Sequence, residues 1–300
     1  MALLPARSTV VLPLIAMCSA GCGANEEPSP GEPSPLDVPQ MEIIIPFEAR
    51  VGSQPFACGQ TYKGLGTTGT EYQPQDFRMY LHDVRLVSDT GQEVAVSLTD
   101  DGMWQAKNAA LLDFADKTGL CSNGTAETNA RVVGKVPMGN YRGLRFRVGL
   151  SQALNHQDVT LEPAPFGDTS LYWGWKSGYV FLRVDGRTTG LPGGYFVHLG
   201  SIDCATPPAG QPWGSAGCDF PNRAEISLEG FELEKSRVVL DVAALLADSN
   251  LDVNSDTPDT SLGCMSQKED PDCAPVFKNL GLSLDKQKPS SGVQTFIRVE

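Results

Sequence analysis

The sequence predicts an all-β protein: a single, disulfide-braced antiparallel β-sandwich or barrel-like domain with long loops. Short segments in which apolar and polar residues alternate recur along the 300-residue chain, and this period of two is the pattern of half-buried strands. The chain also contains 31 glycines and 22 prolines, which favour many turns over long helices. The cysteines beyond the N-terminal region are even in number, as a disulfide framework requires.

The predicted strands follow one another from residue 41 to the C-terminus. Residues 76–87 and 93–98, joined by a turn, have the pattern of an antiparallel hairpin. Only residues 243–247 have a helical pattern, and residues 248–272 are predicted to form an acidic loop. No repeat or internal boundary interrupts the series, so residues 41–300 are predicted to form one domain. The other strand-like segments are 42–49, 109–114, 131–137, 141–150, 171–183, 195–201, 222–228, 237–242 and 292–299.

Residues 1–21 have the pattern of a lipoprotein signal peptide. A positive charge precedes an apolar run at 10–17, which is too short to span a bilayer as a mature helix. Ser19-Ala20-Gly21-Cys22 resembles the bacterial lipobox, in which cleavage precedes a cysteine that is then lipidated. Cys18 is a weaker candidate for the anchor, and an ordinary secretory signal is the alternative.

Residues 22–40 follow as a lipid anchor and a disordered linker rich in Pro, Ser and Glu, with no capacity to form a core. Gly23 stands where an Asp would oppose transport to the outer membrane. We therefore expect an exported protein that is lipid-anchored to the outer membrane and faces the periplasm or the cell surface. The net charge of −13, without a basic stripe, gives no indication of nucleic-acid binding.

Six cysteines remain for disulfides in the exported chain, and about 15 pairings are possible among them. Sequence proximity favours Cys204–Cys218 and Cys264–Cys273. Cys58 would then pair with Cys121. The alternative is a thiolate metal site, but no C-x-x-C spacing occurs in the sequence.

Motifs of common enzymes are missing from the sequence. It contains no G-x-S-x-G elbow, no H-E-x-x-H, no haem-attachment motif and no glycine-rich phosphate loop after a strand. We therefore expect no enzymatic activity, and a hydrolase with an unrecognised site is the weakest alternative. An Asp/Asn series is spaced as calcium ligands are, but it lacks the loop glycine and the closing Glu, which favours a solvated acidic loop. Its members are Asp248, Asn250, Asp252, Asn254 and Asp256.

The stretch 171–183, LYWGWKSGYVFLR, concentrates aromatic residues and strand formers. In one extended strand, Trp173 and Trp175 would lie on the same face. Gly174 between them would allow a tight backbone approach. Taken alone, the stretch is typical of an aromatic core strand.

Histidine and methionine are the soft donors of the chain, which has seven methionines and three histidines, His82, His156 and His198. Imidazole suits copper, and a thioether selects Cu(I), the softer ion. Each side chain taken alone is equally consistent with a structural role. Met265, for example, follows Cys264 and would pack beside a disulfide.

A series of short motifs covers roughly residues 42–284. They are GLG at 64–66, DFR at 76–78, WQ at 104–105, LLDF at 111–114, LNH at 154–156, WGW at 173–175, GY at 178–179, HLG at 198–200, NR at 222–223 and GCMS at 263–266. In this order they resemble the MbnP-like family of periplasmic or lipid-anchored copper-binding proteins.

The resemblance implies a function and a set of site residues. In that family, a partner dihaem enzyme of the cytochrome c peroxidase/MauG type oxidises the first tryptophan of a W-x-W motif to kynurenine. The modified residue then helps to bind one copper ion, as Cu(I), together with His and Met. Carried over, Trp173 is the modified residue, and the ligand candidates are His156, His198 and Met265. His82 is expected not to be a ligand.

One position departs from the family pattern: we associate a Met with this position in the family, and this sequence has Leu171 there. That leaves open whether Met265 supplies the thioether. Opening the indole ring of Trp173 gives an aryl amine and a ketone, new donors that suit a low-coordinate Cu(I) site. The expected function is therefore copper binding in copper homeostasis. The alternative is an extracellular β-sandwich module that binds a protein or a glycan without a metal.

Overall fold

The computed structural model describes residues 38–287 and 293–300. The chain separates into two units, Met1–Val38 and Pro39–Glu300, and all of the described strands and helices lie in the second unit. Within the described residues, no helix is long and apolar enough to cross a membrane.

The N-terminal predictions fall mainly on residues that the structure does not describe. The signal peptide at 1–21, the lipidation of Cys22 and the linker as far as residue 37 lie outside the described residues. The first strand, β1, begins at Gln40, close to the predicted start of the folded domain.

The fold is mostly β, with 41% strand and 7% helix, which confirms the predicted class. Two main sheets account for almost all of the strands, and the strands of the described residues form no closed barrel. The smaller sheet has six strands, with β2 beside β1 and the order β19-β17-β1-β9-β6 for the rest. Its members are β1 (Gln40–Val51), β2 (Gln54–Pro55), β6 (Ser97–Leu98), β9 (Arg131–Pro137), β17 (Val238–Asp241) and β19 (Ile297–Val299).

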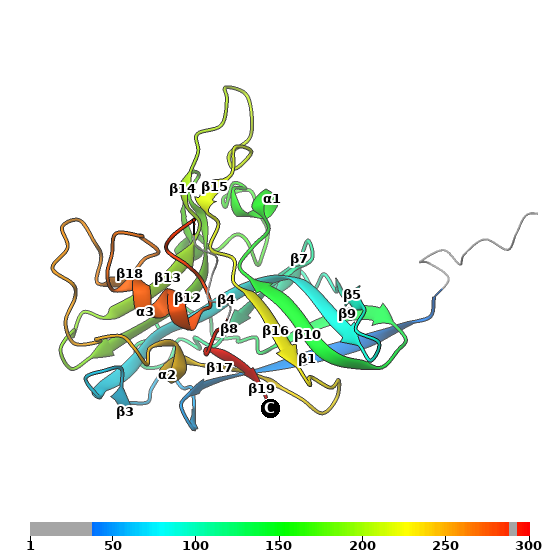
Figure 1. Ribbon diagram of the computed structural model, residues 1–300, viewed down its shortest axis with the longest axis horizontal. Coiled ribbons are helices and arrows are strands. Elements are labelled where there is room, and N and C mark those ends of the chain that lie inside the picture. The colour runs from blue at the N-terminus through cyan, green and yellow to red at the C-terminus, as the bar shows by residue number, and fades with distance from the viewer. Residues whose placement is uncertain (1–37, 288–292) are drawn as a thin grey trace, which may run out of the picture. The chain divides into compact units, whose positions relative to one another are not determined.

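The larger sheet has eleven strands, with the central path β16-β10-β4-β12-β13-β18 (Figure 1). The strands of that path are β4 (Thr70–Ser88), β10 (Tyr141–Val148), β12 (Gly178–Thr188), β13 (Tyr195–Gly200), β16 (Glu225–Glu229) and β18 (Gly263–Cys264). Short strands attach to it: β3 (Tyr62–Leu65), β5 (Glu93–Ala95), β7 (Gln105–Ala106), β8 (Ala109–Asp113) and β11 (Tyr172–Gly174). A separate hairpin pairs β14 (Ile202–Cys204) with β15 (Cys218–Phe220).

The pairing differs from the prediction in two respects. The predicted hairpin forms between β4 and β5, but Ser97 and Leu98 leave it and pair with β9 of the smaller sheet. Two pairs, β1 with β17 and β13 with β18, are parallel, so both sheets are mixed rather than purely antiparallel. Alternation of side chains is the same in both directions of pairing, so it carries no information on strand direction.

The core lies between the two sheets. Along β1, alternate side chains from Ile43 to Val51 are buried, as a strand with one face on a core requires. Phe47 of β1 meets Phe146 of β10 edge to face, with ring centroids 5.9 Å apart. This contact joins the two sheets directly, and in Figure 1 β1 runs across the strands of the larger sheet. The architecture is therefore a β-sandwich.

The six cysteines form the three disulfides that sequence proximity favoured: Cys58–Cys121, Cys204–Cys218 and Cys264–Cys273. Cys204–Cys218 bridges the hairpin β14–β15, and Cys264–Cys273 ties β18 to a helix. Disulfides of this kind stabilise a folded chain mainly by restricting its unfolded state.

Helices are few and short. The predicted helix near residue 243 is confirmed as α2 (Val242–Leu245), capped by the Asp241 carboxylate. Two others, α1 (Gln152–Asn155) and α3 (Cys273–Asn279), were not predicted, because each is too short to show a helical period. A 3₁₀ turn, η1 (Thr169–Leu171), leads into β11.

Candidate metal centre

The tryptophan-rich stretch is a hairpin rather than the single strand that the sequence suggested. Strand β11 ends at Gly174, a turn follows, and β12 begins at Gly178. Gly174 has φ +138° and Gly178 has φ +82°, conformations that glycine adopts far more readily than other residues. Trp175 therefore lies in the turn and is 47% exposed, whereas Trp173 packs partly buried against the core. The prediction that both tryptophans share a strand face is wrong.

The close approach that the sequence placed at Gly174 occurs elsewhere. No neighbouring atom would lie within 4 Å of a Cβ atom on Gly174. On Gly200 of β13, a Cβ atom would lie 2.5 Å from Cζ3 of Trp173, so the indole occupies the space that the missing side chain leaves.

His198 lies on the same face of β13 as this contact. Phe196, His198 and Gly200 alternate along the strand and so share one face. Consistent with this, the rings of Phe196 and His198 are 6.1 Å apart. The imidazole of His198 and the indole of Trp173 therefore lie on one side of the sheet, separated by two positions of β13.

A buried carboxylate fixes the orientation of the His198 ring. Nε2 of His198 lies 2.9 Å from Oδ1 of Asp185, which can only accept a hydrogen bond when ionised. Nε2 therefore carries the proton in the neutral ring, and Nδ1 keeps its lone pair. A metal-ligating histidine is commonly held in this way, by a carboxylate on the nitrogen that does not bind the metal.

Asp185 also connects His198 with the segment before Trp173. Arg183 donates from Nε to Oδ2 of Asp185 at 2.7 Å and from Nη1 to the carbonyl oxygen of Ser170 at 3.0 Å. Arg78 of β4 pairs with Asp76 and reaches Asp168, which caps η1. Hydrogen bonds from two guanidinium groups thus hold η1, and with it the start of β11, against β12 and β4, and Asp185 of β12 accepts from His198.

Met265 is held next to the same part of β13. The hydroxyl of the following residue, Ser266, donates to the carbonyl oxygen of His198 at 2.9 Å and accepts from the backbone N–H of Gly200 at 3.0 Å. The preceding Cys264 pairs with Val197 in the parallel ladder. The backbone of Met265 therefore lies between two residues that contact residues 197–200 of β13, the strand that carries His198 and against which Trp173 packs.

His156 lies beside the turn of the tryptophan hairpin. Its Nδ1 donates to the carbonyl oxygen of Trp175 at 3.1 Å. Its Nε2 is left as the acceptor and lies 3.2 Å from the side-chain nitrogen of Asn155. Burial lowers the pKa of His156, and the positive charge of Arg223 lowers the pKa further, which favours the neutral ring that a metal requires.

Asn155 fixes this arrangement. Its Oδ1 accepts from the backbone N–H of Tyr179 at 2.9 Å, and its Nδ2 donates to the carbonyl oxygen of Ser177 at 3.1 Å. Its backbone leaves no room for a side chain at Gly178, where a Cβ atom would lie 2.1 Å from the carbonyl oxygen of Asn155. The Leu154-Asn155-His156 segment is thus attached to the turn that follows Trp173.

His82 lies on β4, where its Nδ1 donates to the carbonyl oxygen of Gly149 at 2.8 Å. Burial lowers its pKa, and the charge of Arg223 acts in the same direction, so this ring also favours the neutral form. None of the hydrogen bonds found for His82 reaches the tryptophan hairpin or residues 198–200. Its expected exclusion from the ligand set stays a prediction.

One group of three potential donors stands out among the described residues, and the sequence reasoning missed it. Nε2 of His156 and the sulfurs of Cys204 and Cys218 lie within 4.8 Å of one another. The two cysteines are joined in a disulfide, so in this state they offer no thiolate. The loop between β14 and β15 packs on the imidazole, since a Cβ atom on Gly214 would lie 2.2 Å from Cδ2 of His156.

The acidic Asp/Asn series serves the loop itself. Asp252 accepts from Thr70 and from the backbone N–H of Gly190, and Asn254 accepts from the backbone N–H of Gly263. Asp248 pairs with Lys278. These oxygens have protein partners, which agrees with a structural loop.

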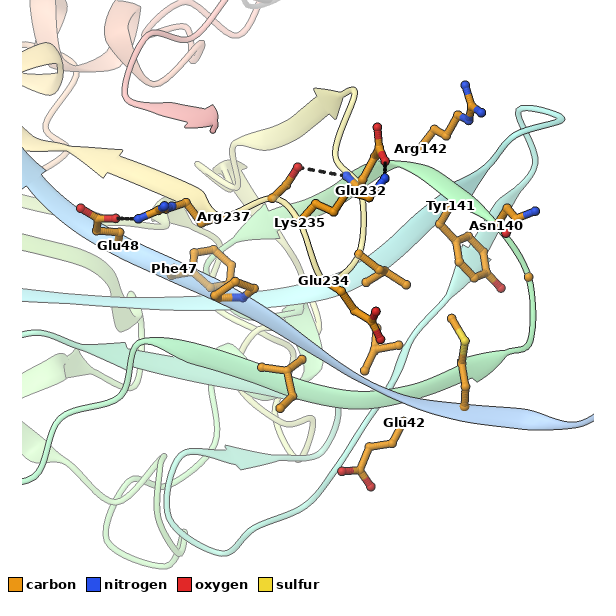
Figure 2. Close-up of a pocket in the computed structure, with 17 residues that line it drawn as sticks. Glu42, Phe47, Glu48, Asn140, Tyr141, Arg142, Glu232, Glu234, Lys235 and Arg237 are labelled. Atoms are coloured by element: carbon orange, nitrogen blue, oxygen red, sulfur yellow. Dashed lines mark hydrogen bonds and ion pairs between the residues drawn. The ribbon is translucent and has the colours of Figure 1, made fainter.

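A groove of about 1080 Å³ lies away from all of these residues (Figure 2). It is formed by β1, the start of β10 and the loop 232–237. Figure 2 shows that several of its charges are paired, Arg237 with Glu48 and Lys235 with Glu232. None of the candidate ligands lines it.

The fold is that of a β-sandwich, and its candidate donors lie on β11 and β13, beside β13 at Met265, and at His156 beneath the β14–β15 loop. The chain belongs to the MbnP family: the MbnP family model matches residues 40–266. It is also similar to the solved structure of MbnP from Methylosinus trichosporium, with a TM-score of 0.77 and 28% sequence identity. That match covers 87% of this chain and 99% of the other. No curated protein matches the chain. The resemblance seen in the sequence is confirmed.

Proposed function

We propose that the protein binds one copper ion, as Cu(I), in copper homeostasis. The site would consist of His156, His198, Met265 and the side chain of Trp173 after its oxidation to kynurenine. One observation supports this above the others: the indole of Trp173 lies on Gly200, on the same face of β13 as His198. Family membership supports the class of function.

The donor chemistry suits copper. In each of the two imidazoles, one nitrogen is bound to an oxygen acceptor, which leaves the other nitrogen with its lone pair. Imidazole nitrogen and thioether sulfur are ligands that Cu(I) accepts. Oxidative opening of the Trp173 indole, with loss of its C2 carbon, would add an aryl amine and a ketone on a strand that the rest of the fold holds in place.

We further propose that a dihaem enzyme of the cytochrome c peroxidase/MauG type supplies the oxidising equivalents. The protein would be exported by the signal at residues 1–21, lipidated at Cys22 and tethered to the outer membrane by residues 22–40. The copper-binding domain would then span residues 41–300.

Mass spectrometry of the protein produced together with its partner enzyme tests the modification. We expect a Trp173 peptide that has lost one carbon and gained one oxygen, and copper in the purified protein. Trp173→Phe should abolish the modification and weaken copper binding, whereas Trp175→Phe, in the exposed turn, should retain the modification at position 173. An unmodified Trp173 in a protein without copper would contradict the proposal.

Single substitutions test the ligands. His156→Ala, His198→Ala and Met265→Ala should each weaken Cu(I) binding in competition with a chromophoric chelator. Met138→Ala is the matched control for the methionine, because Met138 is 65% exposed and lies in the turn before β10. If all three site variants bind Cu(I) as the unsubstituted protein does, the ligand set is wrong.

A further inference from the structure

The disulfide Cys204–Cys218 lies directly beside Nε2 of His156, the ring nitrogen that also accepts from the side-chain N–H of Asn155. Sγ of Cys218 is 3.7 Å from Nε2 of His156, and all three donor atoms lie within 4.8 Å of one another. The two cysteines face each other across the hairpin β14–β15, with their Cα atoms 3.7 Å apart. Rotation about their side-chain bonds can therefore separate the two sulfurs without moving the strands.

The His156 nitrogen is oriented towards these sulfurs as a metal ligand would be. Its other nitrogen is bound to the carbonyl oxygen of Trp175, so the lone pair is on Nε2. Gln152 of α1 directs its side-chain N–H to the carbonyl oxygen of Gly214 at 2.9 Å and lies 4.0 Å from Sγ of Cys218. Figure 1 shows α1 beside the β14–β15 hairpin, in agreement with these contacts.

The electrostatic surroundings favour thiolates at this position. The guanidinium of Arg223 donates to Oε1 of Gln152 at 3.0 Å, and Nε2 of the same Gln152 lies 4.0 Å from Sγ of Cys218. A nearby guanidinium stabilises a thiolate over a thiol, and a neutral imidazole does not oppose it. A cation held by one imidazole and two thiolates would carry a net negative charge when the ion is monovalent, which Arg223 would partly balance.

We propose that reduction of Cys204–Cys218 creates a second metal site, in which Nε2 of His156 and the two thiolate sulfurs bind one soft cation of the Cu(I) class. A d¹⁰ ion with two thiolates and one imidazole satisfies the preference of soft metals for sulfur and nitrogen ligands. Both proposed sites use His156, so the reduced hairpin would withdraw this ligand from the site of Trp173, His198 and Met265. That consequence rests on the proposed function.

The redox step needs a dithiol reductant. Its two thiols give two electrons and two protons to the Cys204–Cys218 bond, which breaks into two thiols, while the reductant closes its own disulfide. When Cu(I) binds, the two cysteine thiols release their protons to solvent. Copper stays Cu(I) throughout.

Exposure distinguishes this disulfide from the other two. Both cysteines of Cys58–Cys121 and both of Cys264–Cys273 are buried, with at most 2% of each residue exposed. Cys218 is only half-buried, so a reductant can reach its sulfur first. No other group of three His, Cys, Asp or Glu donors was found within the described part of the chain.

Copper titration of the full chain produced without the partner enzyme tests the proposal, because Trp173 is then unmodified and the proposed kynurenine site is incomplete. Cu(I) is maintained with ascorbate, which leaves disulfides intact, and a chromophoric Cu(I) chelator competes. One sample is first treated with a phosphine reductant, which is then removed under anaerobic conditions. We expect the reduced sample to bind one more Cu(I) per chain, with sulfur neighbours in its X-ray absorption spectrum at about 2.3 Å, as in other metal–thiolate bonds.

Two variants assign the extra copper. Cys204→Ser/Cys218→Ser should lose it, and His156→Ala should bind it about tenfold or more weakly. Equal copper binding by reduced and oxidised protein, or an extra copper that persists in the double variant, would overturn the proposal. So would an unchanged affinity in His156→Ala.

The unsubstituted protein gives an independent measurement if the double variant does not fold. Bound Cu(I) should protect Cys204 and Cys218 of the reduced protein from alkylation, as peptide masses would show. Alkylation at the same rate with and without Cu(I) would overturn the proposal. The proposed function is tested on protein that was produced together with the partner enzyme and keeps its disulfides, whereas this proposal is tested on reduced protein produced without that enzyme, so the two can fail separately.

Discussion

Asp185 shows at the scale of single residues how a buried charge selects the chemistry of its neighbour. It is almost fully buried, its Oδ1 accepts from His198, and its Oδ2 accepts from Arg183. The carboxylate thereby assigns the proton to Nε2 of His198. The nitrogen with the lone pair is then Nδ1, on the ring edge away from Asp185.

We predict that Asp185→Asn weakens Cu(I) binding by about 10–100-fold, the range found when partners of metal ligands are replaced. The amide can still accept from Arg183, but its N–H₂ would face Nε2 of His198 and favour the tautomer that protonates Nδ1. Chelator competition measures the affinity, and the melting temperature shows whether the fold persists. A variant that folds and binds Cu(I) with unchanged affinity would exclude this role for Asp185.

Glycine 214 is the second residue with a specific steric role. Its Cβ atom would lie 2.2 Å from Cδ2 of His156, whereas Gly210 of the same loop has open space around it. Both have positive φ, +83° and +82°, so alanine strains the backbone equally at the two positions.

We therefore expect Gly214→Ala to displace His156 and to weaken Cu(I) binding, and Gly210→Ala to leave the affinity unchanged. The backbone penalty of about 1 kcal/mol should be common to both variants, so the difference between them reports the contact with His156. Similar affinities of the two variants would show that the loop does not position the imidazole.

At the scale of elements, the β11–β12 hairpin depends on Asn155 at the end of α1. Asn155 is fully buried and bonds to both Ser177 and Tyr179 of the hairpin. The hairpin itself has only a three-residue first strand, which is too short to be stable alone. The position of Trp173 therefore depends on Asn155, which lies earlier in the chain at the end of α1.

Replacing this side chain should destabilise the protein measurably. We expect Asn155→Ala to lower the free energy of unfolding by about 2–4 kcal/mol, because the buried N–H of Tyr179 and the carbonyl oxygen of Ser177 lose their partners. Asn140→Ala, at an exposed turn, should change it by less than about 0.5 kcal/mol. Denaturant unfolding of both variants measures the difference, and equal values would show that the hairpin is held by other contacts.

At the scale of the whole molecule, the free energy of unfolding should depend on pH through the buried carboxyl group of Asp113, at the end of β8. Burial raises the pKa of its carboxyl to about 7, and the hydrogen bond from the Ala115 N–H opposes this only in part. Since the folded pKa lies above the ordinary value of 3.8, the folded protein binds more protons between these two values. Stability from this group is therefore highest at low pH and falls as the pH rises to about 7, by at most about 1.4 kcal/mol per pH unit.

His82 and His156 act in the opposite direction. Burial lowers the pKa of each below the ordinary 6.5, so their contribution to stability is present above that pH and is lost as the pH falls. Asp113→Asn separates the two effects, because it keeps both histidines.

We expect Asp113→Asn to match the unsubstituted protein near pH 4 and to become progressively more stable than it towards pH 8. The amide imitates the protonated carboxyl: it can accept from Ala115 and donate to Thr125, the two present partners. Denaturant midpoints across this range test the prediction. A difference in stability that does not change with pH would show that Asp113 ionises as an exposed carboxyl does.

The predictions that rested on neighbouring residues of the sequence were largely confirmed. Alternation along β1, β4 and β10 identified strands, and an even set of cysteines identified three disulfides with their partners. The tryptophan stretch was wrong in conformation, because composition does not show that Gly174 and Gly178 leave the extended region.

The sequence by itself determined the fold class, the disulfides and the family, because strand alternation, cysteine spacing and ordered motifs are all properties of the chain in one dimension. Tertiary structure alone decided that Trp173 lies on Gly200 beside His198, and that His156 faces the Cys204–Cys218 disulfide. These contacts join segments that are far apart in the sequence. Their geometry depends on strand pairing and on the space that two glycines leave, neither of which a local pattern encodes.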